Sequence, residues 1–181
     1  GAGFPTHVKL ANRVEVVIAN GAECEPLLRV DQQLMARFPE KLVAGLLRVK
    51  EAVGATRAVI GLKGKYHDAF DALRPFAEKA GVELFPLGAF YPAGDEVTLV
   101  YEVTRRVIPE GALPLSVGCI VQNIHTLLWI EDAIEKRPVT SRFLTVGGAV
   151  RQPRTIHAPI GMLVADVIAA AGGATVSDFA A

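Results

Sequence analysis

The sequence is poor in cysteine and has no excess of charge of either sign. Only Cys24 and Cys119 are cysteines among the 181 residues. Two cysteines cannot build a disulfide framework or hold an iron–sulfur cluster alone, so a reducing compartment is expected. The 19 Lys and Arg residues balance 19 Asp and Glu residues. A zero net charge argues against a protein that binds nucleic acid by neutralising phosphates over a broad face, and we expect no nucleic-acid partner.

The sequence also has no long apolar run. The longest stretch free of Asp, Glu, Lys and Arg covers residues 111–130, and Pro114, Gln122 and Asn123 interrupt it. A membrane-spanning helix needs about 20 mostly apolar residues, so this stretch is better explained as a buried strand that leads into a helix. No signal peptide pattern opens the chain. With 51% hydrophobic residues, the chain is predicted to be folded, soluble and cytoplasmic.

Short apolar runs alternate with helical patterns through most of the chain. This alternation predicts βαβ units, an α/β fold and a mainly parallel sheet with helices on both faces. The predicted strands are 14–19, 57–62, 82–87 and 118–121, and the predicted helices are 39–53, 65–80, 95–106 and 124–135.

The pattern changes to β-β-α after residue 138. Residues 142–150 and 155–158 are predicted to form a hairpin, which a helix over 162–171 follows. We therefore predict two domains, 1–138 and 139–181. The glycine-rich start of the chain is expected to be the truncated remainder of a longer loop, and both ends are expected to be cut from a longer polypeptide.

Glycine or carboxamide residues lie where three predicted strands lead into helices. They are Asn20, Gly94 and Asn123. In open parallel sheets, ligands bind beyond the carboxyl ends of the strands, so convergence of these residues on one edge predicts a nucleotide-type pocket. Glycine-rich backbone near Lys9 could approach a phosphate or a flat ring.

Each of these residues also has a purely structural explanation. Asn123 and Asp95 are good helix N-caps, and Glu25 could belong to a simple acidic turn. Cys24 is better explained as a small buried residue and His125 as a structural one, with no metal site. A hydrolase that uses both is disfavoured, because nothing in the sequence orients one toward the other.

Four motifs occur in series. They are Gly-Ala-Gly-Phe-Pro-Thr-x-x-Lys from Gly1, Asn-x-Ala-Glu-Cys-Glu-Pro from Asn20, Tyr-Pro-x-Gly-x-Glu from Tyr91, and Gln-Asn-x-x-Thr from Gln122. In order and spacing the chain resembles a flavin-binding family. Its members include the Rnf-complex C subunit, the cobalamin reductase of propanediol-utilisation compartments, and the NADH-binding flavoprotein subunit of respiratory complex I. The Glu-Cys-Glu-Pro and Tyr-Pro forms resemble the first two members more than the third.

The resemblance implies a Rossmann-like domain that holds FMN non-covalently and takes hydride from NADH. Hydride transfer would then be the chemistry of the flavin, with no catalytic side chain and no metal ligand. The implied contacts of the flavin are Gly1, Gly3, Phe4, Lys9, Asn20, Gly94, Asn123 and Thr126. The residues implied near the flavin and nicotinamide are Glu23, Tyr91 and Glu96.

The resemblance extends to the rest of the chain. Residues from Arg142 onward resemble a partial SLBB domain, a small β-grasp fold. The implied function is that of an NADH:acceptor oxidoreductase domain in an electron-transfer complex, on the cytoplasmic side and peripheral to a membrane assembly. Iron–sulfur (4Fe-4S) clusters are expected only in an absent downstream region, which leaves this piece inactive alone. The alternative hypothesis is a flavin-free module that keeps the fold and docks to a larger redox assembly.

Overall fold

A four-stranded parallel sheet forms the centre of the computed structural model, which describes residues 6–178. The strand order is β3-β2-β1-β4, and every neighbouring pair is parallel. This confirms the predicted α/β class. The strands are β1 Val16–Gly21, β2 Arg57–Lys63, β3 Glu83–Leu87 and β4 Cys119–Asn123.

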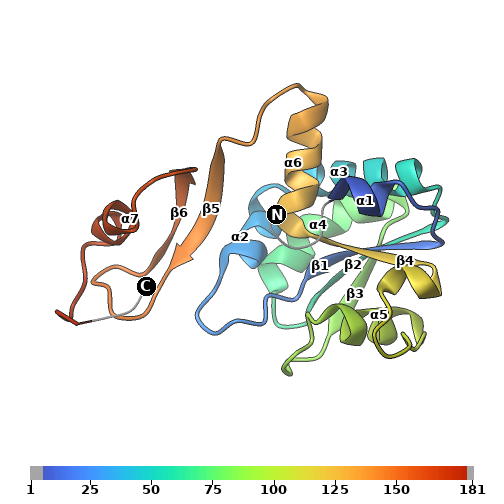
Figure 1. The fold of residues 1–181 in the computed structure, drawn as a ribbon, viewed down its shortest axis with the longest axis horizontal. Coiled ribbons are helices and arrows are strands. Elements are labelled where there is room, and N and C mark those ends of the chain that lie inside the picture. Colours follow the sequence, from blue (N-terminus) through green and yellow to red (C-terminus); the bar gives the residue numbers. More distant parts are fainter. Residues whose placement is uncertain (1–5, 179–181) are drawn as a thin grey trace.

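Helices cover both faces of this sheet (Figure 1). One face packs against α2, α3, α4 and α6 through the larger core cluster, and the other packs against α5 through a smaller cluster. The helices of this part are α1 Thr6–Leu10, α2 Val30–Arg37, α3 Pro39–Val53, α4 His67–Ala80, α5 Glu96–Thr104 and α6 Ile124–Ile134, with a 3-10 turn η1 at Pro114–Val117.

Helix α3 has the bounds that its sequence pattern predicts. Pro39 occupies the first turn, where a missing N–H costs nothing. Gly54 ends the helix with φ of 66°, a left-handed conformation that favours glycine. Leu42 and Leu46 lie on the apolar stripe and are fully buried. Local signals and burial agree here, which explains why the prediction is right.

Helix α2 is absent from the sequence prediction. Its sequence, Val-Asp-Gln-Gln-Leu-Met-Ala-Arg, is short and largely polar, so it carries little apolar periodicity. Tertiary contacts stabilise it instead, because Leu34 and Met35 are buried in the core. Helix α1 and the η1 turn are likewise too short to leave a clear periodic signal.

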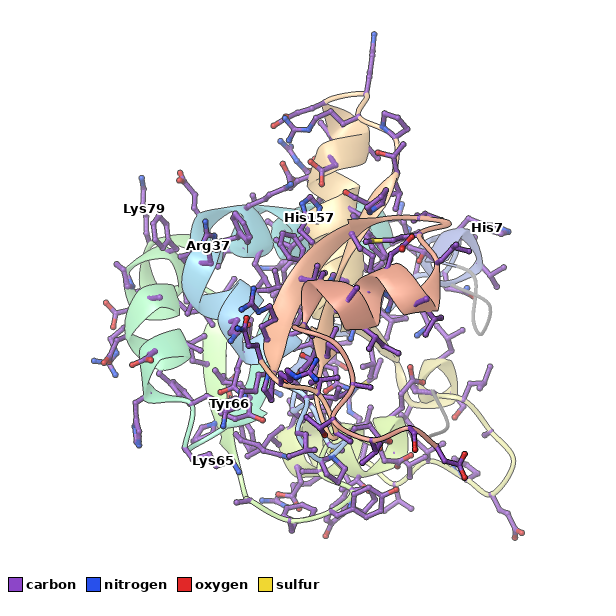
Figure 2. The ribbon with its side chains drawn as sticks, turned by 90° about the vertical axis from the view of Figure 1, so that its left-hand side faces the viewer. His7, Arg37, Lys65, Tyr66, Lys79 and His157 are labelled. Atoms are coloured by element: carbon purple, nitrogen blue, oxygen red, sulfur yellow. The ribbon has the colours of Figure 1, made fainter. Side chains whose placement is uncertain are left out.

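The second part of the chain is a two-stranded antiparallel sheet and a short helix. They are β5 Ser141–Val146, β6 Arg154–Pro159 and α7 Val164–Ala170. The first strand was predicted to reach residue 150 but ends at Val146, before Gly147-Gly148, and Val150 makes only an isolated bridge to Ala174. In Figure 2, which is viewed from the side of this small sheet, β5, β6 and α7 lie in front of α2 and α6.

Strand β5 packs against the larger part through one aromatic side chain. The ring of Phe143 lies 5.9 Å from Phe38, 6.4 Å from His125 and 4.2 Å from His157, measured between ring centroids. The predicted division at residue 138 stays a prediction. Within residues 6–178 there is no helix long and apolar enough to cross a membrane.

Candidate functional site

A cavity of about 410 Å³ lies at the carboxyl edge of the sheet, where three predicted site segments meet. It falls in the range of 300–1,000 Å³ that is usual for small-molecule sites. Segments that follow β1, β3 and β4 contribute to its wall, and β5 forms the opposite side. The lining residues are Asn20, Glu23, Cys24, Glu25, Leu28, Val30, Asp31, Gly94, Asn123, His125, Arg142, Phe143, Leu144 and Thr145.

Asn20 and Gly94 are held together, as the sequence predicts for residues at one sheet edge. The Asn20 amide Nδ2 donates to the Gly94 carbonyl at 2.8 Å, and its Oδ1 accepts from the Ala22 N–H at 3.1 Å. The Gly94 N–H in turn lies 2.9 Å from Cys24 Sγ. A Cβ at Gly94 would lie 3.0 Å from that sulfur and 3.3 Å from Asn20 Oδ1. Only glycine therefore keeps this corner of the cavity in place.

Glu23 uses its carboxylate to cap helix α2. Its Oε1 accepts from the Asp31 N–H at 3.0 Å, and its Oε2 accepts from the Gln32 N–H at 3.4 Å. Its backbone adopts a left-handed φ of 40°, which is uncommon for a non-glycine residue. The carboxylate thus lies on the cavity wall and satisfies free N–H groups at a helix start.

Asn123 joins two further cavity residues. Its Oδ1 accepts from the His125 N–H at 2.9 Å, which confirms the predicted N-cap of α6. Its Nδ2 donates to Asp31 Oδ2 at 3.4 Å. The cap therefore also orients an acid from another helix.

Asp31 and His125 form a buried pair in the cavity wall, with Oδ1 and Nδ1 3.6 Å apart. Burial, together with the nearby Glu23 carboxylate, raises the pKa of Asp31 from 3.8 to about 7, against the lowering effects of Asn123 and Arg142. Burial and Arg142 lower the pKa of His125 from 6.5 to about 4. Between these two pKa values both groups are mostly uncharged, so the contact is not an ion pair.

Lys9 and Glu96 lie together, but outside the wall of this cavity. Lys9 Nζ donates to Glu96 Oε1 at 3.0 Å and to the Val121 carbonyl at 2.7 Å. Both line a separate hollow of about 20 Å³ beside η1, which is too small for a nucleotide. The bridge ties α1 to α5 and to strand β4.

The remaining predicted site residues do not line the cavity. Tyr91 is 77% exposed, and Thr126 lies in the first turn of α6 outside the lining. Gly1, Gly3 and Phe4 fall outside the described residues. The structure thus brings Asn20, Glu23, Gly94 and Asn123 together and places Lys9 and Glu96 in a neighbouring pair.

Four lining residues were not among the predicted site residues: Asp31, His125, Arg142 and Phe143. His125 was expected to be structural, and its 4% exposure agrees with that, yet it also faces the cavity. Asp31 lies in the unpredicted α2. Arg142 and Phe143 come from β5, whose packing against the larger part leaves no local signal in the sequence.

Comparison with known proteins identifies the larger part. Residues 1–132 match the Nuo51 FMN-binding domain family, and residues 143–178 match the SLBB domain. The chain belongs to the Nuo51 FMN-binding domain family. This confirms the resemblance drawn from the four motifs, and the SLBB match agrees with the β-grasp expectation for the second part.

Relatives of this family member are redox proteins. The chain is 51% identical to the cobalamin reductase PduS of Citrobacter freundii, over 98% of the chain and 40% of the relative. It is 40% identical to the C component of the Na⁺-translocating ferredoxin:NAD⁺ oxidoreductase complex of Acetobacterium woodii, over 96% and 41%. The chain thus spans about two fifths of the length of these relatives.

A solved structure agrees with this assignment. A crystal structure of an NAD⁺-reducing NiFe-hydrogenase in the air-oxidised state matches 94% of this chain and 36% of the hydrogenase chain, with a TM-score of 0.76 and 28% identity. The fold of this FMN-binding domain family member is therefore that of a larger redox protein's domain.

The cavity of this family member fits a flavin nucleotide in size and in chemistry. Gly94 keeps a corner open that a Cβ would fill. Asp31 Oδ1 and His125 Nε2 are buried without a hydrogen-bond partner in residues 6–178, so the wall has polar atoms to offer a ligand. Over the same residues, no group of three or more His, Cys, Asp or Glu side chains could hold a metal ion.

Proposed function

We propose that this chain binds FMN in the cavity at the carboxyl edge of the sheet and serves as the NADH-oxidising domain of an electron-transfer flavoprotein. The observation that carries the proposal is the convergence of Asn20, Gly94 and Asn123 on one cavity. Membership of an FMN-binding family supports the choice of ligand. When bound, FMN would supply the hydride-accepting chemistry that no amino-acid side chain has.

The side chains of the wall would bind and orient the ring. Asn20 carries both a donor and an acceptor on one amide, and its contact with the Gly94 carbonyl fixes that amide in place. Asn123 is fixed in the same way by the His125 N–H. Fixed amides lose little rotamer freedom on binding, which favours a tight and specific complex.

The other predicted contacts belong to the same proposal. Lys9 and Glu96 would contribute from the neighbouring ion pair, and Glu23 from the cap of α2. Thr126, Tyr91 and the glycine-rich start of the chain would contribute from outside the cavity wall. The full proposed set is Gly1, Gly3, Phe4, Lys9, Asn20, Glu23, Tyr91, Gly94, Glu96, Asn123 and Thr126.

The relatives support a role for the chain in a larger machine. One of them is named as a cobalamin reductase and another as part of a ferredoxin:NAD⁺ oxidoreductase complex. We infer that this chain also receives electrons from NADH and passes them to iron–sulfur clusters elsewhere, in a complex peripheral to a membrane on its cytoplasmic side.

The test compares FMN binding by the wild-type chain, Gly94→Ala and a matched control. A Cβ at Gly94 meets three side-chain atoms at 3.0–3.3 Å, among them Asn20 Oδ1. We expect the affinity for FMN to fall at least tenfold, because Asn20 must move. Gly64→Ala follows a neighbouring strand, meets nothing closer than 3.7 Å, and should bind like the wild type.

Two results would contradict the proposal. Equal affinities for all three proteins would place FMN elsewhere, and no saturable binding by the wild type would favour the flavin-free docking module instead. Addition of NADH to the FMN-loaded wild type, without oxygen, should bleach the flavin absorbance. An unbleached flavin would contradict the NADH part alone.

A further inference from the structure

The cavity wall contains two buried polar atoms that have no hydrogen-bond partner within residues 6–178. They are Asp31 Oδ1 and His125 Nε2. Their side chains are only 11% and 5% exposed. Native proteins pair nearly all such atoms, because an unpaired buried polar group loses its hydration without compensation. The two atoms therefore mark a place where a ligand or a proton completes the site.

Charged and titratable groups surround this pair on every side. Glu23, which caps α2, lies against Asp31, and Arg142 of β5 acts on both members of the pair. The other titratable groups that face the pair are Tyr66 on α4, Cys24 and Glu25 in the cavity wall, and His157 on β6, which stacks on Phe143. Only Arg142 among them carries a positive charge at neutral pH.

This environment determines where a proton resides. Removal of water and the Glu23 carboxylate both disfavour a charged Asp31, which raises its pKa to about 7. Burial keeps His125 neutral, with a pKa of about 4. Near neutral pH the pair thus holds one exchangeable proton, on Asp31, and a neutral imidazole beside it.

A negatively charged ligand in the cavity would tip this balance. It would add a second anion near Asp31 and displace water from the wall, and both changes favour the protonated carboxyl. The protonated carboxyl can also donate a hydrogen bond to an acceptor on the ligand, which a carboxylate cannot.

We propose that the Asp31–His125 pair is a proton-uptake site, which couples binding of an anionic flavin nucleotide in this cavity to pH. The inference rests on the proposed function. One proton passes from solvent to the Asp31 carboxylate when the nucleotide binds, and no other bond forms or breaks. The affinity therefore falls when the pH rises above neutrality, by up to about tenfold per pH unit for a single linked proton.

The test uses the full chain and FMN, with Kd measured from about pH 7 to 8.5, where the FMN phosphate (second pKa ≈ 6) is already mostly ionised. We expect wild-type Kd to rise about tenfold over this range. Asp31→Asn keeps the shape of a protonated Asp31, so its Kd should stay constant within about twofold. Calorimetry at pH ~7.5 in two buffers of different ionisation enthalpy should show uptake of about half a proton or more by the wild type, and none by Asp31→Asn.

Glu25→Gln is the matched control, because it removes an exposed carboxylate from the same cavity wall. It should keep the wild-type slope. Equal slopes for wild type and Asp31→Asn, or a flattened slope in Glu25→Gln alone, would overturn the inference while FMN binding itself still stands. No FMN binding at any pH would overturn both the inference and the proposed function.

A readout on the ligand-free chain tests the pair independently. NMR of the imidazole of His125 should show it neutral near pH 7, with a chemical-shift step that reports the titration of the neighbouring Asp31. Asp31→Asn should abolish that step. If the wild type shows no step between about pH 6 and 8, the pair holds no exchangeable proton there and the inference is wrong.

Discussion

Replacement of Asp31 by Asn should make the protein more stable than the wild type as the pH rises. Asp31 has a pKa near 7 in the folded chain, because it is buried beside Glu23, against 3.8 in the unfolded chain. The folded state therefore binds the proton more tightly. The stability that this binding contributes is fully present below about pH 4 and is lost as the pH rises toward 7. Asn mimics the protonated acid and does not titrate.

The size of the effect follows from the difference between the two pKa values. A shift from 3.8 to about 7 corresponds to roughly 4 kcal/mol at about 1.4 kcal/mol per unit. Asp31→Asn should equal the wild type in stability near pH 4 and exceed it by roughly 3–4 kcal/mol near pH 7.5. With its side chain only 11% exposed, Asp31 is little screened by solvent.

Urea unfolding at several pH values measures this difference directly. Subtraction of the two curves removes the contributions of all other titrating groups. Asp68→Asn, which removes an exposed carboxylate from the first turn of α4, is the matched control and should run parallel to the wild type. If Asp31→Asn also ran parallel to the wild type between about pH 4 and 7.5, the buried and neutral state of Asp31 would be refuted.

Three further predictions concern the same fold. His125→Gln should gain up to roughly 3 kcal/mol over the wild type as the pH falls from 6.5 to about 4, because wild-type stability is lost there when His125 must be charged; a constant difference in urea unfolding would contradict this. Asp95→Ala removes the acceptor for two N–H groups at the start of α5 and should cost about 1 kcal/mol, and an unchanged urea midpoint would refute the cap. Gly45→Ala would place a Cβ 2.2 Å from the Leu127 carbonyl oxygen and should lower the thermal midpoint by several degrees, equivalent to about 2 kcal/mol or more. Gly64→Ala is its control, and equal midpoints would contradict the close packing of α3 on α6.

Much of the fold could be predicted because local signals and burial agree. Strand β2 is a continuous apolar run, and α4 ends at Gly81 in a left-handed conformation, so both could be read from neighbouring residues. Helix α2 could not, because its stability comes from contacts distant in sequence, such as the burial of Met35. Strand β5 is shorter than predicted because Gly147 follows Val146 directly, in a bend.

The site shows the same division. Asn20, Gly94 and Asn123 could be found because strand ends in a parallel sheet converge on one edge. Asp31 and Arg142 could not, since their place in the wall depends on how α2 and β5 pack against that edge. Nor could sequence spacing separate Lys9 and Glu96 from the cavity, because both lie beside strand ends but pair with each other.

The most direct test of the account is a titration of the chain with FMN, followed by flavin fluorescence at fixed pH. The account predicts saturable binding of one FMN per chain, and weakened binding in Asn20→Ala, which removes the amide that contacts the Gly94 carbonyl. Absence of saturable binding, or a saturable site that Asn20→Ala leaves unchanged, would contradict the assignment of this cavity to FMN.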